Sequence, residues 1–214
     1  IRQQIKSYQS RQPYTVQQKG EWYHAPSDKR VFSMEANWEK KYTNPLYDLT
    51  TNQKPFNDFV PVVDRETYRF LQNQDIKTRT LEGAFNYYHI LNPTNHINWS
   101  LGYSDTRQEL ISSLEQTETN DDLDLGEFEN DSRFDFQDLY LGMTYKTKWK
   151  SVVISPSLYL HRYAWNDIQM EDELSNDKVL LLPGMYAKWS IKSNRSLTYR
   201  FSSQANFMDE YSEY

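Results

Sequence analysis

The chain has 214 residues, a net charge of −6 and a mean hydropathy of −0.90, so it is long enough for one large or two small domains. The negative charge gives no support to nucleic-acid binding, the lack of cysteine excludes disulfide frameworks and cysteine-ligated metals, and no apolar run approaches the ~20 residues of a membrane helix. Any membrane role therefore requires a β-barrel or a surface association.

The first predicted hairpin lies near the N-terminus. A weak strand over residues 14–24 leads to a turn near residue 28 and then to a strand whose apolar positions are Phe32, Met34, Ala36 and Trp38. A long connection over residues 44–67 follows, and it contains Pro45, Pro55 and Pro61. Proline removes a backbone donor and suits connections better than strand interiors.

The second predicted hairpin has the clearest pattern. Residues 81–91 alternate between apolar and polar side chains, and the same pattern returns after residue 96 and continues towards Gln116. The four residues Asn92-Pro93-Thr94-Asn95 predict a tight turn near residue 94. An acidic connection over residues 117–135 follows.

Two more hairpins complete the series. Strands over residues 139–145 and 154–160 flank a turn near residue 150, and strands over residues 181–189 and 197–205 flank a turn near residue 194. A third longer connection, residues 171–178, separates these two hairpins.

Eight strands in four hairpins, with short turns at one end and long connections at the other, predict an all-β, antiparallel, up-and-down transmembrane β-barrel. Most of the strands exceed the ~9–11 residues that cross a bilayer at a tilt. We expect the apolar face to meet lipid and the polar face to line a lumen. Aromatic residues expected near strand ends are Trp22, Trp38, Tyr103, Trp149, Trp189 and Tyr199. Pro156 and Pro183 fall inside strands, so each predicts a bulge or a strand margin.

Five segments resemble the barrel of TonB-dependent receptors, especially those of Bacteroidota. They are LNPTNHINWSLGYS, LYLGMTYKTKW, VVISPSLYLHRYAW, VLLLPGMYAKWSI and SLTYRFSSQANFMDEYSEY. In particular, Leu182-Pro183-Gly184-Met185-Tyr186 followed by residues 197–202 is similar to a strand pair of that family. The resemblance covers about residues 14–214.

The resemblance implies a larger barrel of about 22 strands with an N-terminal plug domain. No plug is found in this sequence, and the end at Tyr214 reads as a truncation, so we expect residues 1–214 to be a single barrel segment. The implied function is import of a nutrient ligand across the outer membrane of a Gram-negative bacterium. The implied partners are outer-membrane lipid, the TonB complex through the missing plug region, and a surface lipoprotein lid.

Two alternatives remain open at the level of sequence. One is a complete eight-stranded barrel that serves as a structural anchor or adhesin without transport, since a barrel of about eight strands is just wide enough for side chains to fill. The other is a soluble β-rich binding protein, because the strands of a soluble sandwich also alternate.

Candidate ligand contacts are Tyr47, Phe56 and Phe59, three aromatic residues on the proline-containing connection. The acidic residues 120–127 invite a calcium site, but in an EF-hand frame the required glycine falls on Leu125, so a solvated loop is expected. His89 and His96 flank a turn and are candidates for a metal pair across the hairpin, with two interfacial polar residues as the simpler interpretation. We find no nucleophile elbow and no glycine-rich phosphate loop, and Glu171, Asp172 and Glu173 are interpreted as surface charges, so neither an enzyme nor a bound cofactor is expected.

Overall fold

The alternating segments form one antiparallel sheet in the computed structural model of the chain, which describes residues 5–54, 66–117, 123–124, 130–170, 172–192 and 194–205. Its strands are β1 (Ile5–Arg11), β2 (Tyr14–Ser27), β3 (Arg30–Thr43), β4 (Pro45–Thr51), β5 (Tyr68–Asn92), β6 (Asn95–Thr117), β7 (Leu123–Asp124), β8 (Asn130–Trp149), β9 (Val152–Gln169), β10 (Asp172–Lys192) and β11 (Arg195–Ser202). The described part of the chain has no helix that is long and apolar enough to span a membrane.

These elements amount to eight long strands. The pairing of Arg11 with Pro45 continues in register to the pairing of Tyr14 with Tyr42, so β1 with β2, and β3 with β4, are each one strand with a short interruption. Prolines 13 and 45 lie at these interruptions, where the ladder lacks a donor. The remaining element, β7, is a two-residue piece that pairs with β6. The prediction of an antiparallel up-and-down sheet of about eight strands is confirmed within the described residues.

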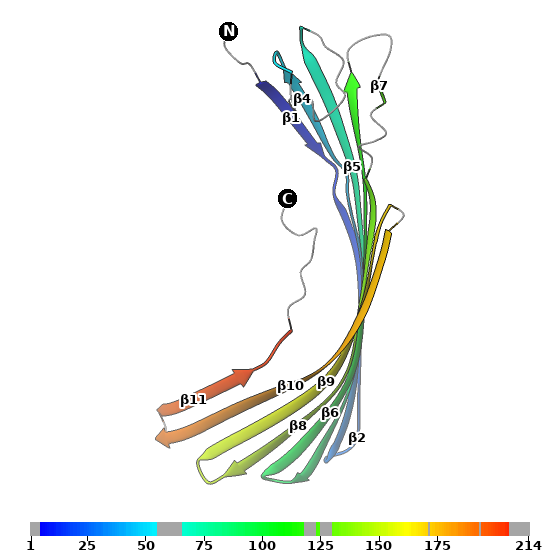
Figure 1. Ribbon diagram of the computed structural model, residues 1–214. Coiled ribbons are helices and arrows are strands. Elements are labelled where there is room, and N and C mark those ends of the chain that lie inside the picture. Colours follow the sequence, from blue (N-terminus) through cyan, green and yellow to red (C-terminus); the bar gives the residue numbers. More distant parts are fainter. Residues whose placement is uncertain are drawn as a thin grey trace.

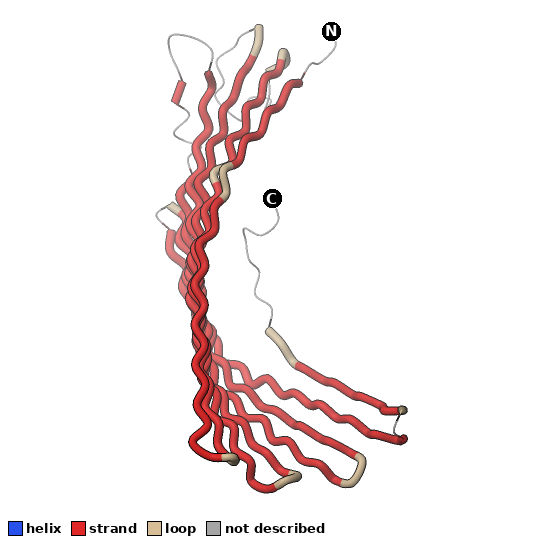
Figure 2. The backbone as a smooth tube through the Cα atoms, turned by 180° about the vertical axis from the view of Figure 1, so that it is seen from behind, coloured by secondary structure: helices blue, strands red, loops and turns tan. Residues whose placement is uncertain are grey.

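The sheet curves like part of a barrel wall but does not close (Figure 1). In the described residues β2 pairs only with β3, and β11 pairs only with β10, so both margins lack a further neighbour. Adjacent hairpins are staggered, because Arg30 at the start of β3 lies opposite His89 while β5 continues to Asn92. Stagger of this kind accompanies the tilt of strands in a barrel. Seen from behind, the strands overlap in the middle of the sheet and fan apart towards both ends (Figure 2).

The connections at the two ends differ from the sequence prediction. Tight turns occur near residues 28, 94, 150 and 194, and the turn at Lys150 has a left-handed φ of 53°. At the other end the strands run further than expected, however. Gln169 pairs directly with Asp172, so a tight turn through Met170 replaces the predicted connection over residues 171–178.

The other two predicted connections are also shorter than expected. The strand β4 occupies Pro45–Thr51, within the predicted connection 44–67, and β8 begins at Asn130, within the predicted connection 117–135. In these extensions polar residues predominate and the apolar ones occur on both faces, as Leu46 and Leu49 of β4 do, so the alternation of apolar and polar residues disappears although the backbone ladder continues. The backbone hydrogen bonds do not depend on side-chain polarity.

The two prolines inside strands lie at sites where the ladder tolerates them. Pro183 faces the end of β11, since its carbonyl accepts a hydrogen bond from the Ser203 backbone N–H just past that strand. This is the expected strand margin. At Pro156 there is neither a bulge nor a margin: the β8–β9 ladder omits the pairs between Thr144–Ser157 and Thr147–Ile154 without changing register.

Ion pairs reinforce the polar extensions of the strands. Arg69 on β5 holds Asp48 on β4 through two hydrogen bonds, with Nε at 3.0 Å and Nη2 at 2.6 Å from the carboxylate oxygens. Arg107 on β6 similarly contacts Asp135 on β8 at 2.6 Å. The Arg69 hydrogen bond is the main cause that lowers the pKa of Asp48 from its ordinary value of 3.8.

Because the folded-state pKa of Asp48 is depressed, the pair stabilises the fold fully above the unfolded-state pKa and loses this effect as the pH falls through the folded-state pKa. We expect Asp48→Asn to lower the free energy of unfolding by about 0.5–1 kcal/mol at neutral pH, since the pair is half-exposed. The difference from wild type should vanish in strong acid. Urea unfolding followed by tryptophan fluorescence measures both values.

The matched control is Asp177→Asn, because Asp177 lies 3.7 Å from Arg162 and both side chains are more than 60% exposed. This substitution should leave stability unchanged at either pH. A loss of stability in Asp48→Asn that persists undiminished at low pH would show that the ion pair is not its cause.

Candidate functional site

The register sorts the side chains onto two faces of the sheet. Every buried side chain in the described ranges lies on the same face, namely Pro45, Thr51, Tyr68, Phe70, Ser100, Ser112, Gln116, Ser132, Phe134 and Tyr163. Side chains on the concave side of a curved sheet converge and cover one another. We therefore call this concave side the inner face and the opposite side the outer face.

The outer face carries an apolar belt. One register row crosses seven strands and consists entirely of apolar residues, each 39% to 58% exposed: Trp22, Met34, Phe85, Leu101, Leu141, Leu160 and Leu181. Further rows below it contain Trp99, Leu158 and Phe201, which are 42% to 46% exposed. No layer of the described structure covers these side chains, so the belt is not the inside of a soluble sandwich formed by these residues.

The belt has the height of a bilayer core. On β8 it runs from Trp149 to Leu139, and on β10 from Trp189 to Val179. Ten residue steps give about 33 Å along the strand, or about 25 Å across a membrane at a tilt of about 40°. Trp149 and Trp189 share the row nearest the tight turns. Trp22, in contrast, lies in a central row rather than near a strand end, so that prediction was wrong.

The inner face combines polar side chains with a column of aromatic rings. Consecutive ring centroids are 5.1 to 6.4 Å apart along the series Phe134, Phe136, Tyr163, His161, Tyr140 and Tyr159. Asp138 lies beside this column, with its Oδ1 2.9 Å from His161 Nδ1. The column was not predicted from the sequence, although its residues share one alternation on β8 and on β9.

Two glycines set the position of the rings. A Cβ at Gly102 would overlap the ring of Tyr140, and a Cβ at Gly142 would overlap the ring of Tyr159. Each tyrosine therefore lies flat over the backbone of the neighbouring strand, directly across from its glycine. The aromatic ring thus covers backbone that glycine leaves bare, an arrangement that fixes the register of neighbouring strands.

A polar hollow of about 540 Å³ adjoins Tyr140 on the inner face. Its lining includes Glu35, Glu82 and Asp138, and the side chain of Asn37 donates a hydrogen bond to Glu82 at 2.9 Å. Such a surface suits water or a polar ligand. The described residues contain no group of three or more side chains arranged to hold a metal ion.

Of the three candidate ligand contacts, the structure places one. Tyr47 lies on β4, paired with Gln9 and Gln72, and its half-buried side chain is on the inner face. It is thus part of the wall rather than of a loop. Phe56 and Phe59 lie outside the described residues, so the three aromatic residues are not brought together.

The two histidines predicted as a possible metal pair are not brought together. His89 and His96 cannot form a pair, because His89 faces outward opposite Ile97 while His96 faces inward opposite Ile90. Each ring stacks instead on a tyrosine, Tyr87 and Tyr88 respectively. The acidic residues 120–127 lie outside the described residues apart from β7. Asp172 and Glu173 belong to β10, and residue 171 is not described.

Comparisons with known proteins give a likeness in structure only. No family profile matches the sequence, and no curated protein matches it either. The ferric citrate transporter FecA in its unliganded form is similar with a TM-score of 0.50 and 9% sequence identity, over 87% of this chain and 35% of that protein.

Two further solved structures are similar at lower TM-scores. The alcaligin outer-membrane receptor FauA of Bordetella pertussis gives 0.46 at 8% identity, over 89% of this chain and 35% of that one. The translocator domain of the autotransporter NalP from Neisseria meningitidis gives 0.36 at 10% identity, over 88% and 65%. The chain thus spans about a third of the length of FecA and FauA. It has the antiparallel fold of an outer-membrane barrel wall.

The flat packing of Tyr140 on Gly102 predicts a specific sensitivity. Gly102→Ala places a methyl group where the ring lies, so we expect the free energy of unfolding to fall by about 1–3 kcal/mol. Gly20→Ala is the matched control, because its Cβ has no atom within 4 Å, and it should be neutral. Urea unfolding of both variants gives the comparison.

A second background tests the cause. In a Tyr140→Ala protein the ring is gone, so Gly102→Ala should cost much less than in the wild type. An equal cost in both backgrounds would mean that the backbone of Gly102, and not the ring above it, limits the substitution.

Proposed function

We propose that this chain is part of the wall of an outer-membrane transport barrel of the TonB-dependent receptor type, which imports a nutrient ligand. The observation that carries the proposal is the apolar belt of the outer face. Its central row alone leaves seven large apolar side chains between 39% and 58% exposed. In water such a contiguous apolar surface is unfavourable, whereas in a bilayer it contacts the acyl chains of the lipids.

The two faces suit a barrel wall in an outer membrane. Antiparallel strands satisfy each other's backbone groups, which the hydrocarbon core demands of every spanning segment. The inner face presents Glu35, Glu82, Asn98 and Asp138, as expected of a wet lumen. Strands such as β5, with 25 residues, extend well beyond the membrane, a feature of barrels with tall walls on the outside of the cell.

A receptor fits the open sheet better than a small anchor does. The sheet curves without closing in the described residues, and eight strands form about a third of a barrel of about 22. The likeness to FecA covers a comparable share of that protein, 35%. The FecA likeness supports the barrel fold, and import is the step that we propose beyond it.

The remaining roles follow from this proposal. Outer-membrane lipid surrounds the belt, a plug domain fills the lumen and contacts the TonB complex, and a surface lipoprotein of the Bacteroidota type covers the outer opening. Tyr47 is proposed as a ligand contact because it lies on the inner face of the extended wall. Phe56 and Phe59 are proposed on sequence position alone.

The belt predicts a large difference between the two faces. Leu141→Arg puts a charge on the central row of the outer face, which should destabilise the protein in lipid by about 2–4 kcal/mol. Thr144→Arg, three residues further along the same strand and on the inner face, should cost far less because water reaches it. Folding into lipid vesicles, read by the heat-modifiable migration of the folded band, compares the two. Equal costs for the two arginines would contradict a lipid-facing belt.

Energised import requires contact with TonB, which the alternative anchor function does not. The full-length protein, isolated from outer membranes, should co-purify with TonB after in-cell cross-linking. A folded, membrane-embedded protein that never cross-links to TonB would favour the anchor or adhesin, and a protein recovered in the soluble fraction would favour the soluble alternative.

A further inference from the structure

The inner face of the wall carries no charged side chain over a wide area above the belt. The area consists of every inward residue from Tyr68 to Thr80 on β5, from Thr106 to Gln116 on β6 and from Ser132 to Phe136 on β8. All of these residues are apolar or aromatic, or carry a hydroxyl or amide group. We call this area the uncharged strip.

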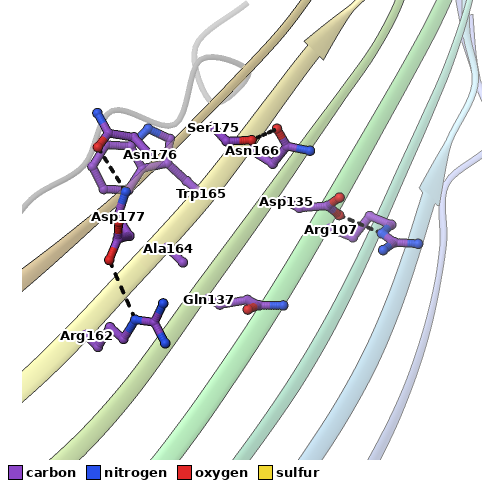
Figure 3. A pocket seen from close by; sticks show the side chains of 10 residues that line it. All are labelled: Arg107, Asp135, Gln137, Arg162, Ala164, Trp165, Asn166, Ser175, Asn176 and Asp177. Carbon is purple, nitrogen blue, oxygen red and sulfur yellow. Dashed lines mark hydrogen bonds and ion pairs between the residues drawn. The ribbon is translucent and has the colours of Figure 1, made fainter.

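The outer face of the same strands is densely charged, in contrast. Arg107 of β6 contacts Asp135 of β8 at 2.6 Å (Figure 3). Beside this pair, Arg162 Nε of β9 lies 3.7 Å from Asp177 Oδ2 of β10. Both faces of the extensions lie in water if the belt spans the membrane, so solvation alone does not explain why the charges stay on one of them. The inner face therefore fits a partner that brings no charge.

Three oxygen atoms around Phe134, a member of the strip, lack hydrogen-bond donors. Gln108 Oε1, Ser132 Oγ and Asp167 Oδ1 are shielded from water and have no hydrogen-bond partner in the described residues. Gln108 and Asp167 face Phe134 across the two neighbouring ladders, and Ser132 lies two residues before it on the same face. Gln108 and Asp167 are half-buried as whole residues, so rotation of their side chains brings both oxygens to the lumen. A shielded acceptor without a donor costs free energy, so these oxygens fit a ligand that supplies hydroxyl or N–H donors.

The aromatic column leads from the strip down the wall. Phe136 belongs to both, and Tyr163, His161 and Tyr140 continue the column with successive centroids 5.1 to 5.9 Å apart. Because Tyr140 lies flat over Gly102, one face of its ring is turned towards the lumen. Such a face packs against the C–H groups of a sugar ring, while the hydroxyl groups at the edge of the sugar bond to neighbouring oxygens.

Charges at the lower end of the column disfavour an anionic ligand. The hollow of about 540 Å³ beside Tyr140 is lined by four carboxylates and a single lysine, namely Glu21, Glu35, Glu82, Asp138 and Lys19. An anion would be repelled there, and the strip has no basic side chain to hold it. A cation finds no carboxylate within the strip either, since Asp167 lies beside it on β9. The ligand that fits these surfaces is therefore uncharged and rich in hydroxyl groups.

We propose that the uncharged strip and the aromatic column bind an uncharged oligosaccharide in the outer part of the lumen. Phe136 and Tyr140 stack against the apolar faces of sugar units, and Gln108 and Asp167 accept hydrogen bonds from sugar hydroxyls. The inference rests on the proposed function, because it requires the inner face to line a lumen, and it specifies the class of nutrient that the lumen admits.

The test uses the full-length protein, purified from outer membranes in detergent and applied to an array of immobilised oligosaccharides. The array contains neutral gluco-, galacto-, manno- and xylo-oligosaccharides and, for comparison, oligogalacturonate and sulfated chains. We expect binding to neutral members. Calorimetric titration with a bound member should give an affinity that changes by less than about twofold between low and high salt, because no charge takes part.

Two substitutions locate the site. Phe136→Ala removes a ring of the column and should weaken binding about tenfold. Gln108→Leu removes the unpartnered amide oxygen and should weaken binding about three- to tenfold. Urea unfolding of Gln108→Leu should show no loss of stability, since that oxygen has no partner to lose. Tyr23→Ala is the matched control and should bind as the wild type does, because Tyr23 is an inner-face ring on β2, 67% exposed and away from the strip.

Four results would overturn the proposal. Binding confined to acidic oligosaccharides, or no binding to any member of the array, would exclude an uncharged saccharide. Binding of neutral peptides in place of sugars would assign the strip to peptides. An affinity that falls steeply with salt would show that charge carries the contact. Equal losses in Phe136→Ala and Tyr23→Ala, or unchanged binding in both Phe136→Ala and Gln108→Leu, would remove the column and the strip from the site.

The proposed import function fails separately from this site. A protein that binds neutral oligosaccharides but never cross-links to TonB keeps the saccharide site and loses the transport role. A protein that cross-links to TonB but binds no neutral oligosaccharide keeps the transport role and loses the saccharide site.

Discussion

A single backbone register through the sheet is the constraint on which the rest of the structure depends. Because successive side chains point to opposite faces, a slip of one residue between two strands would send every apolar side chain of one strand to the other face. The row from Trp22 to Leu181 exists only because six consecutive ladders keep their register. The irregularities are confined to the turns, as between Ile90 and Asn92, where they do not disturb the rows.

The same register separates two environments along each strand. On the outer face of β6, Trp99, Leu101 and Tyr103 are followed by Asp105 and Arg107. The first three are exposed and uncharged, while the last two form ion pairs with neighbouring strands. Charged side chains of this kind are well solvated in water, whereas placing them in hydrocarbon costs free energy. The height of this change is therefore a physical marker of the water boundary in the proposed membrane.

Alternation of apolar and polar residues predicted the eight strands, because every second residue of a strand that crosses the belt is apolar. It could not predict the extensions, such as Asp172 to Lys178 on β10, where polar residues predominate on both faces and only the backbone pairing defines the strand. For the same reason the sequence predicted Tyr47 on a loop, because no clear alternation marks its strand. In the structure Tyr47 lies in the ladder between Gln9 and Gln72.

Side-chain contacts between neighbouring strands could not be predicted from the sequence for a different reason, because they depend on the register of the strands. The aromatic column joins Phe136 and Tyr140 of β8 to His161 and Tyr163 of β9, and only the register brings these rings together. The positions of His89 and His96 around a turn suggested proximity, but the pairing of His89 with Ile97 places them on opposite sides. When the register is unknown, the spacing of two residues around a turn does not show whether their side chains lie on the same face of the sheet.

The order of strands in the sheet also bears on how the wall is assembled. From β5 onward each long strand pairs with the long strand that precedes it in the chain, and four of the connections between these strands are tight turns. Bringing such partners together closes short loops, which carries little entropic cost and favours fast pairing. The wall can accordingly form by adding one hairpin after another from either end. Each newly paired strand then offers its free edge to the next strand.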